Sequence, residues 1–211
     1  MEVIQIKNIS KPITIPLLVI SLIVEIFLLV DGSYFFPNWS EYQQVIIIYL
    51  LISASLLGVS KQQFFDISFF DAMIYFVPAF FITALVIGQT VRPLVGVTNT
   101  ASYEALQILL QIFVVSITEE LFFRGFVQNY LGWIIQAPIF ALFHLVAYTS
   151  LYGIDLYAFF TALIMGLIFG YIVKIFSEKN KRSTGLAITW GMHAGWNVAV
   201  ATGMFYLMGV I

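Results

Sequence analysis

Six ionisable or amide side chains lie inside runs of apolar residues, where polar groups are otherwise scarce. They are Glu119, Glu120, Arg124, His144, His193 and Asn197. The chain has only two histidines, and both belong to this set. A carboxylate with an imidazole can take a proton from water, and a second imidazole with a carboxamide can donate hydrogen bonds to an oxyanion. These residue types predict hydrolysis of an amide bond by activated water, without a Ser or Cys nucleophile.

The spacing of these residues places them on defined helix faces. Glu120 and Arg124 are four residues apart, so they share a face and can pair, whereas Glu119 is rotated by about 100°. His193 and Asn197 are also four residues apart. The opposite face of their helix carries a stripe of small residues, namely Ala187, Gly191, Gly195 and Ala199. Such a stripe suits close helix contact, so we expect this helix to have one polar side and one packing side.

Two histidines and one glutamate can also hold a metal ion. Glu119, His144 and His193 would leave the fourth position of a zinc ion open. The His-Glu-x-x-His pattern of metalloproteases is absent from the sequence, so the spacing alone does not favour a metal. Zinc is the one cofactor that the residues leave open, and they indicate no other.

The elements that must position these side chains are membrane helices. Of the 211 residues, 61% are hydrophobic and only 9% are charged, against about 25% charged in a soluble domain. Such a composition excludes a soluble globular domain and a disordered chain. The net charge of -2 offers no basic patch for nucleic acid. The expected surroundings of the chain are a lipid bilayer.

The intervals between charged residues predict an all-α, polytopic membrane helix bundle with about seven transmembrane helices. A span needs about 20 mostly apolar residues. The expected helices lie near residues 13–30, 43–60, 72–90, 104–128, 134–150, 156–176 and 186–208. Residues 1–211 are interpreted as a single integral membrane domain, with a motif-bearing core at about 104–208. Glu25, inside the first helix, has no assigned role.

Lysine and arginine residues at or near the ends of the expected spans predict the orientation of the chain. One side collects Lys7, Lys11, Lys61, Lys174, Lys179, Lys181 and Arg182, and the other side has only Arg92. Because cytoplasmic loops carry the excess of such residues, we predict a multi-pass protein of the cell membrane with a cytoplasmic N-terminus.

Three of the polar residues are expected at one depth in the membrane. Counted from the cytoplasmic ends of their helices, Glu119, His144 and His193 each lie on the order of 10–15 Å inside. A shared site requires this agreement, so the three side chains are predicted to converge.

The polar residues resemble three motifs of a family of intramembrane proteases. The family is the CAAX protease and bacteriocin-processing family, also called the type II CAAX prenyl endopeptidase or ABI family. Its motifs are Glu-Glu-x-x-x-Arg, Phe-x-x-x-His and His-x-x-x-Asn. They stand here as Glu119-Glu120-Leu121-Phe122-Phe123-Arg124, Phe140-Ala141-Leu142-Phe143-His144 and His193-Ala194-Gly195-Trp196-Asn197. The resemblance covers about residues 117–199.

The resemblance implies a role for each motif residue. Glu119 would activate water with the help of His144, while His193 and Asn197 would stabilise the oxyanion. The second glutamate and the arginine of the first motif would mainly hold the geometry. The family has been described both as metalloproteases and as metal-independent glutamate proteases, and the sequence leaves both open.

The resemblance also implies a peptide or membrane-protein substrate. Eukaryotic members cleave prenylated CaaX proteins, and bacterial or archaeal members are linked to peptide maturation, bacteriocin self-immunity or regulated proteolysis. The prediction is therefore an intramembrane endopeptidase. Two other classes stay open: a non-catalytic immunity or scaffold protein of the same fold, and a small proton-coupled transporter, which would also bury Glu and His. Taken alone, the charged residues also fit an ion-pair cluster that locks two helices.

Overall fold

The computed structural model describes residues 67–95, 108–109, 111–152 and 156–202. Within this part of the chain the fold is all-helical and contains no strand. The prediction of an all-α protein is confirmed to that extent. The helices expected near residues 13–30 and 43–60, together with Glu25, lie outside the described residues.

Four long α-helices and one mixed helical segment form the described bundle. The long helices are α3 (Phe69–Val95), α7 (Trp133–Tyr152), α8 (Leu156–Glu178) and α9 (Arg182–Thr202). The mixed segment is continuous and consists of η1 (Gln111–Ser116), α5 (Ile117–Glu119), η2 (Glu120–Val127) and α6 (Gln128–Leu131). We call residues 111–131 the motif helix. Its η1 and η2 parts are π-helical, a rare form that often occurs at functional sites.

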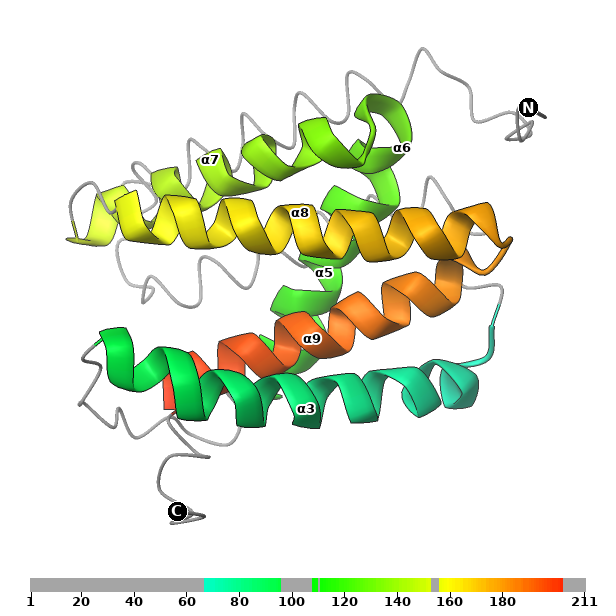
Figure 1. The fold of residues 1–211 in the computed structure, drawn as a ribbon, viewed down its shortest axis with the longest axis horizontal. Coiled ribbons are helices and arrows are strands. Elements are labelled where there is room, and N and C mark those ends of the chain that lie inside the picture. Colours follow the sequence, from blue (N-terminus) through cyan, green and yellow to red (C-terminus); the bar gives the residue numbers. More distant parts are fainter. Residues whose placement is uncertain (1–66, 96–107, 110, 153–155, 203–211) are drawn as a thin grey trace, which may run out of the picture.

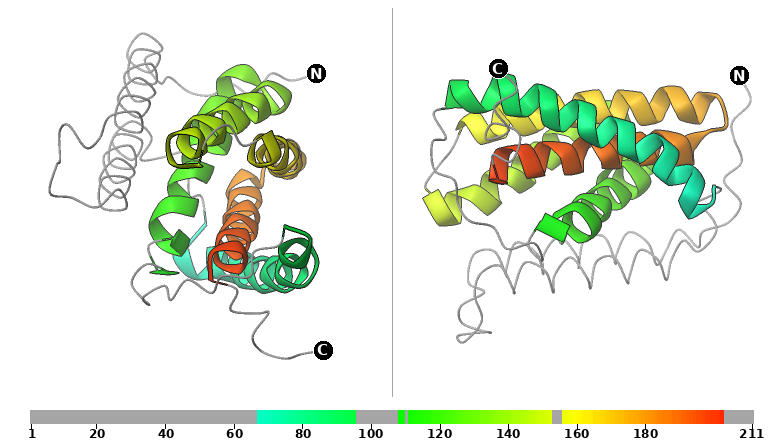
Figure 2. Two further views of the ribbon diagram at one scale, coloured as in Figure 1. Left: turned by 90° about the vertical axis from the view of Figure 1, so that its left-hand side faces the viewer. Right: turned by 90° about the horizontal axis from the view of Figure 1, so that it is seen from below.

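Helix α9 lies at the centre of the described bundle. It packs most extensively against α3, and it also contacts α8 and the motif helix (Figure 2). Helices α7 and α8 run side by side in opposite directions (Figure 1). The start of α3 and the turn between α8 and α9 lie at one end of the molecule in Figure 1, and the end of α7 and the start of α8 lie at the other end.

Local sequence signals set several helix ends. The backbone N–H of Asp71 donates to Ser68 Oγ over 3.1 Å, so the serine caps the start of α3. Gly132, with φ of 86°, separates α6 from α7. Asn180 adopts φ of 57° after α8, and the N–H of Lys181 returns to Phe176 O over 2.8 Å. A left-handed residue followed by such a bond is a common helix C-terminus.

Glycines let α9 approach α3 at backbone contact. A Cβ on Gly191 would lie 2.4 Å from Phe76 O, and one on Gly195 would lie 2.4 Å from Phe80 O. No side chain fits at those distances, so only glycine permits this approach. The predicted small-residue packing side of α9 is thereby confirmed.

A buried glutamine joins α7 to α8. Gln136 is fully buried, and its Nε2 donates to Gly166 O over 2.6 Å. A Cβ on Gly166 would lie 3.0 Å from Ala137 Cα, so this glycine also serves close packing. Helices in lipid associate through small residues and such interhelical hydrogen bonds.

Several expected boundaries were wrong. Helix α9 begins at Arg182, not near 186, and α3 continues to Val95 so that Arg92 lies within it. Lys174 lies inside α8, within the range expected for that helix, although it was counted among the charges that follow it. A charged residue need not end a helix, because a long Lys or Arg side chain can continue it while the charged head reaches polar surroundings. The helix expected at 104–128 ends at Leu131 and is partly π-helical.

Two described helical stretches are long and apolar enough to cross a membrane. They are Phe69–Ile87 and Phe159–Glu178, and Trp133–His144 is a shorter apolar stretch. Only 28% of each of the two longer stretches is buried inside the protein. Much of their apolar surface therefore faces outward.

Candidate active site

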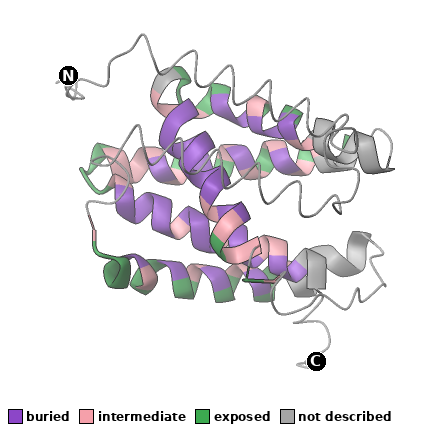
Figure 3. Ribbon diagram, turned by 180° about the vertical axis from the view of Figure 1, so that it is seen from behind, coloured by how far each residue is buried: buried purple, intermediate pink, exposed green. Residues whose placement is uncertain are grey.

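The motif helix is the buried element that carries Glu119, Glu120 and Arg124 into the bundle. All eight residues of η2 are buried, and Figure 3 shows this burial along the middle of the molecule. In η1, side chains supply hydrogen-bond donors to the backbone carbonyls. Ser116 Oγ donates to the O atom of residue 111 over 2.7 Å, and Trp190 Nε1 of α9 donates to that of residue 112 over 2.8 Å. Tertiary contacts thus help to hold the unusual backbone in place.

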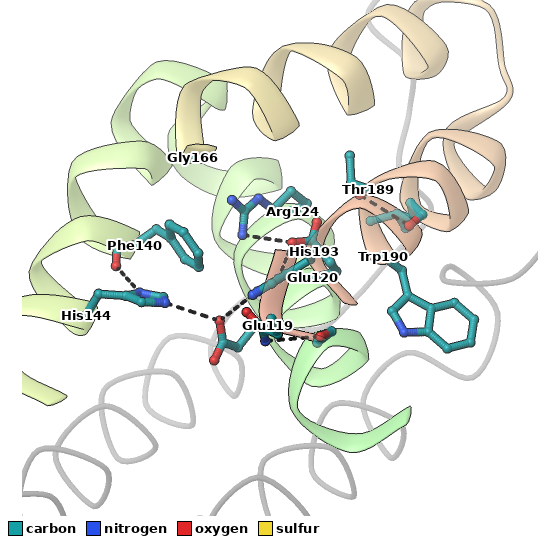
Figure 4. A network of polar contacts seen from close by, with 12 residues as sticks. Glu119, Glu120, Arg124, Phe140, His144, Gly166, Thr189, Trp190 and His193 are labelled. Atoms are coloured by element: carbon teal, nitrogen blue, oxygen red, sulfur yellow. Dashed lines mark hydrogen bonds and ion pairs between the residues drawn. The ribbon is translucent and has the colours of Figure 1, made fainter. Parts of the chain in front are cut away.

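Three helices bring Glu119, His144 and His193 together. Glu119 lies at the end of α5, His144 in α7 and His193 in α9. Glu119 Oε2 is 3.4 Å from His193 Nε2 and 3.7 Å from His144 Nε2 (Figure 4). The three side chains converge, as their equal depths predicted.

Glu120 forms the other half of the cluster. Its Oε1 lies 3.1 Å from Arg124 Nη1, which confirms the predicted pair, and 2.9 Å from His193 Nδ1. The imidazole of His193 therefore lies between the two adjacent carboxylates, with one ring nitrogen toward each. Spacing along the chain gave no indication of this bridge, because it depends on how α9 docks against the motif helix.

Arg124 is fully buried and enclosed by aromatic rings. Its guanidinium carbon lies 4.1 Å from the ring centre of Phe140, 5.1 Å from that of Phe169 and 5.9 Å from that of Phe123. Such stacking suits a flat guanidinium better than an ammonium group. The aromatic rings and Glu120 together fix the arginine from several directions.

The shortest contacts of the two histidines favour a proton on Nδ1 of each ring. His144 Nδ1 lies 2.9 Å from Phe140 O, and because a carbonyl only accepts, Nδ1 is the donor. His193 Nδ1 likewise donates to the Glu120 carboxylate. A neutral ring of this tautomer presents a lone pair at Nε2. Both Nε2 atoms face Glu119 Oε2, so the cluster is arranged to receive a proton.

Asn197 lies one helical turn beyond His193 and belongs to a neighbouring polar group. Its Nδ2 donates to Gln111 Oε1 and to Ser116 Oγ, each over 3.3 Å. Sequence reasoning missed Gln111 and Ser116. The available signal was that both are polar residues within an otherwise apolar interval, but neither is charged.

The cluster reaches the protein surface through His144. The His144 side chain is 20% exposed, whereas those of Glu119 and His193 are 6% and 5% exposed. Glu120 and Arg124 are almost completely covered, at 1% and 0%. A reactant would therefore approach from the side on which His144 lies.

The sequence left zinc open as a cofactor of this cluster. Across the described ranges, no group of three or more His, Cys, Asp or Glu residues is placed so that it could hold a metal ion. This includes Glu119, His144 and His193, the ligands that the sequence suggested.

Comparison with known families agrees with the motifs. Residues 101–199 match the family described as type II CAAX prenyl endopeptidase Rce1-like. This match confirms the resemblance of the motif-bearing part of the chain to the CAAX protease and bacteriocin-processing family. No curated protein and no solved structure is significantly similar to this chain.

Proposed function

We propose that this protein is an intramembrane endopeptidase in which Glu119 activates the water that attacks a peptide bond. The main observation in support is that His144 Nε2 and His193 Nε2 converge on Glu119 Oε2, at 3.7 and 3.4 Å. The family match supports the reaction class. The substrate is a peptide or a membrane protein.

The first step is removal of a proton from water. Glu119 takes this proton, and His144, the most exposed member of the cluster, assists and passes it on. The resulting hydroxide attacks the carbonyl carbon of the scissile bond. The leaving amine then receives the proton, so that the site returns to its starting state.

The charges of the cluster favour this step. Two carboxylates and one guanidinium give a net charge of about -1 when both imidazoles are neutral. A proton taken from water brings the cluster to neutrality. Uncompensated charge is costly in a membrane interior, so the surroundings support Glu119 and its histidines as the acceptor.

His193 and Asn197 are proposed to stabilise the oxyanion. His193 donates from Nδ1 to Glu120, and with both ring nitrogens protonated it can also donate from Nε2. The Asn197 amide donates to Gln111 and Ser116, so the substrate oxygen would replace one of these acceptors. Preorganised donors of this kind are often the largest single contribution to catalysis.

Cleavage of quenched-fluorescent peptides by the purified protein in detergent tests the proposal. The peptide set should include a farnesylated CaaX peptide and unmodified apolar peptides. We expect Glu119→Gln to lower kcat by about 10²–10⁴-fold, since it removes the base while keeping the shape. Lys179→Gln is the matched control, because it changes an exposed residue of the turn after α8.

The outcomes separate the competing interpretations. Loss of cleavage in Glu119→Gln but not in Lys179→Gln supports the protease. Equal cleavage by all three proteins assigns the activity to a contaminant and rejects the proposal. A cleavage rate that falls with chelator and returns with zinc would add a metal to the mechanism. Binding of a peptide without turnover would favour the immunity or scaffold alternative.

The protein is also proposed to be a multi-pass protein of the cell membrane with its N-terminus in the cytoplasm. The two outward-facing apolar stretches and the asymmetric distribution of Lys and Arg support this placement. About seven spans are proposed in total.

A further inference from the structure

Arg182 connects the two helices that supply opposite sides of the cluster. It is the first residue of α9, and its Nη2 donates to Arg124 O over 2.7 Å and to Gly125 O over 2.8 Å. Its Nη1 donates to Asn129 Oδ1. One side chain therefore holds two backbone carbonyls of η2 and a side chain of α6. The sequence alone indicates only a loop cation at this position.

The chemistry of the contact requires an arginine. A guanidinium presents several donors in a rigid plane, whereas an ammonium group acts as a point charge on a flexible stem. Burial lowers the pKa of Arg182 to about 10, so the side chain is still positively charged at neutral pH. A charged donor held on neutral carbonyls forms stronger hydrogen bonds than a neutral donor.

The position of the contact makes it an anchor for the cluster. Along α9, His193 lies about 16 Å from Arg182 at the α-helical rise per residue, and Glu119 precedes Arg124 by five residues in the motif helix. Both helical segments therefore lead from the Arg182 contact to the cluster. There, His193 Nδ1 lies 2.9 Å from Glu120 Oε1, and His193 Nε2 lies 3.4 Å from Glu119 Oε2. A shift of α9 along its axis at Arg182 would therefore change the distances between His193 and both carboxylates.

We propose that Arg182 is a positioning residue that fixes the axial register of α9 against η2 and so sets the contact of His193 with Glu119 and Glu120. Its consequence for peptide cleavage rests on the proposed function. The register itself does not, and it is measurable without any activity.

Histidine-selective ¹⁵N NMR gives the direct test. The chain contains two histidines, so the ring signals are few, and a His144→Asn sample assigns them. Arg182→Ala and Arg182→Lys should shift the ring signals of His193, because its hydrogen bond to Glu120 lengthens. Those of His144 should stay, because its Nδ1 bonds to Phe140 within α7.

Lys181→Ala is the matched control. It removes one positive charge from the same turn, but Lys181 is exposed. If Arg182 served only as a topological charge, Lys181→Ala would resemble Arg182→Ala, and Arg182→Lys would behave as wild type. Asn129→Ala, which removes one of the three acceptors, should shift His193 in the same direction by less.

The kinetic readout distinguishes the two proposals from each other. With an active wild type, we expect Arg182→Lys to lower kcat by about 10–100-fold with little change in KM, as small misplacements of reacting groups do. A shifted His193 signal in a wild type that cleaves no peptide would keep the register proposal and reject the proposed function. Unchanged His193 signals in Arg182→Lys, with the melting temperature of the wild type, would overturn the register proposal. If Arg182→Ala does not fold, the test of the register proposal rests on Arg182→Lys.

Discussion

At the scale of single residues, side chains of the same type have different surroundings in the cluster. His193 is covered and lies between two carboxylates, whereas His144 is partly exposed and held by a carbonyl of its own helix. Glu119 faces two imidazoles, whereas Glu120 lies against a guanidinium. Of these two adjacent glutamates, Glu119 is thus the proposed base, and Glu120 supports the geometry of the cluster.

The two histidines should respond differently to truncation. His144→Ala should lower kcat by about 10²-fold or more while changing the melting temperature little, since its hydrogen bond to Phe140 lies within a single helix. His193→Ala should lose activity and also stability, by about 1–3 kcal/mol, because Glu120 loses a buried donor. Activity assays and thermal unfolding in detergent check both expectations. Equal loss of stability in the two variants would contradict this division.

Arg124 should not tolerate a lysine. Arg124→Lys keeps the charge but loses the stacking on Phe140 and Phe169, so we expect a loss of about 1–3 kcal/mol in stability. Lys174→Arg is the control, since that cation pairs with Glu178 at the surface, where such pairs contribute about 0–1 kcal/mol. Thermal unfolding compares the two. A melting temperature of Arg124→Lys equal to that of Lys174→Arg would refute the role of the aromatic enclosure.

At the scale of helices, contact between α3 and α9 places the polar side of α9 toward the motif helix. Gly191 and Gly195 lie on the face toward α3, and His193 and Asn197 project toward the motif helix. The packing of one face of α9 against α3 therefore orients its polar face toward the motif helix.

Alanine at the two contact glycines should separate α9 from α3. Gly191→Ala and Gly195→Ala each place a Cβ 2.4 Å from a backbone oxygen, so overpacking of about 1–3 kcal/mol should exceed the gain in helix propensity of about 1 kcal/mol. Gly185→Ala should be milder, because its Cβ would lie 2.9 Å from Phe176 Cβ, a longer distance than the 2.4 Å at the other two glycines. Thermal unfolding of the three variants ranks them. A Gly185→Ala variant less stable than the other two would contradict this order.

Sequence predicted the features that depend on spacing within one helix. The Glu120–Arg124 pair and the two sides of α9 follow from positions four residues apart. Features that depend on docking between helices were not predictable in this way. The bridge formed by His193, the π-helical backbone and the contact of Asn197 with Gln111 all need the tertiary arrangement. The place of Arg182 within α9 was not predictable either, because a charge at the end of an apolar run is typical of a loop.

At the scale of the whole molecule, the described helix ends agree with one membrane orientation. The turn between α8 and α9 and the start of α3 lie at the same end, and the start of α8 lies at the other (Figure 1). The turn between α8 and α9, which the charge pattern assigned to the cytoplasm, thus lies at the same end as the start of α3.

Single-cysteine labelling checks this orientation. The chain has no cysteine, so Ile67→Cys, Lys179→Cys and Leu156→Cys each report one position. We expect a membrane-impermeant reagent to label positions 67 and 179 only after access to the cytoplasmic side. Position 156 should be labelled from the outside or be protected by lipid. Labelling of 67 and 179 from opposite sides would reject the topology.

The π-helical segments on both sides of Glu119 have a consequence for how this chain can change in length. Each residue added to or removed from a helix rotates the remainder of that helix by about 100° and moves it by about 1.5 Å. With η1 ending at Ser116 and η2 beginning at Glu120, a deletion in η1 would turn its hydrogen-bonding groups away from Asn197 and Trp190. A deletion in η2 would turn Arg182's two carbonyl acceptors away from α9. We therefore expect sequences that preserve this site to accept substitutions in the motif helix but no insertion or deletion, while the same changes are tolerated in the turn after α8.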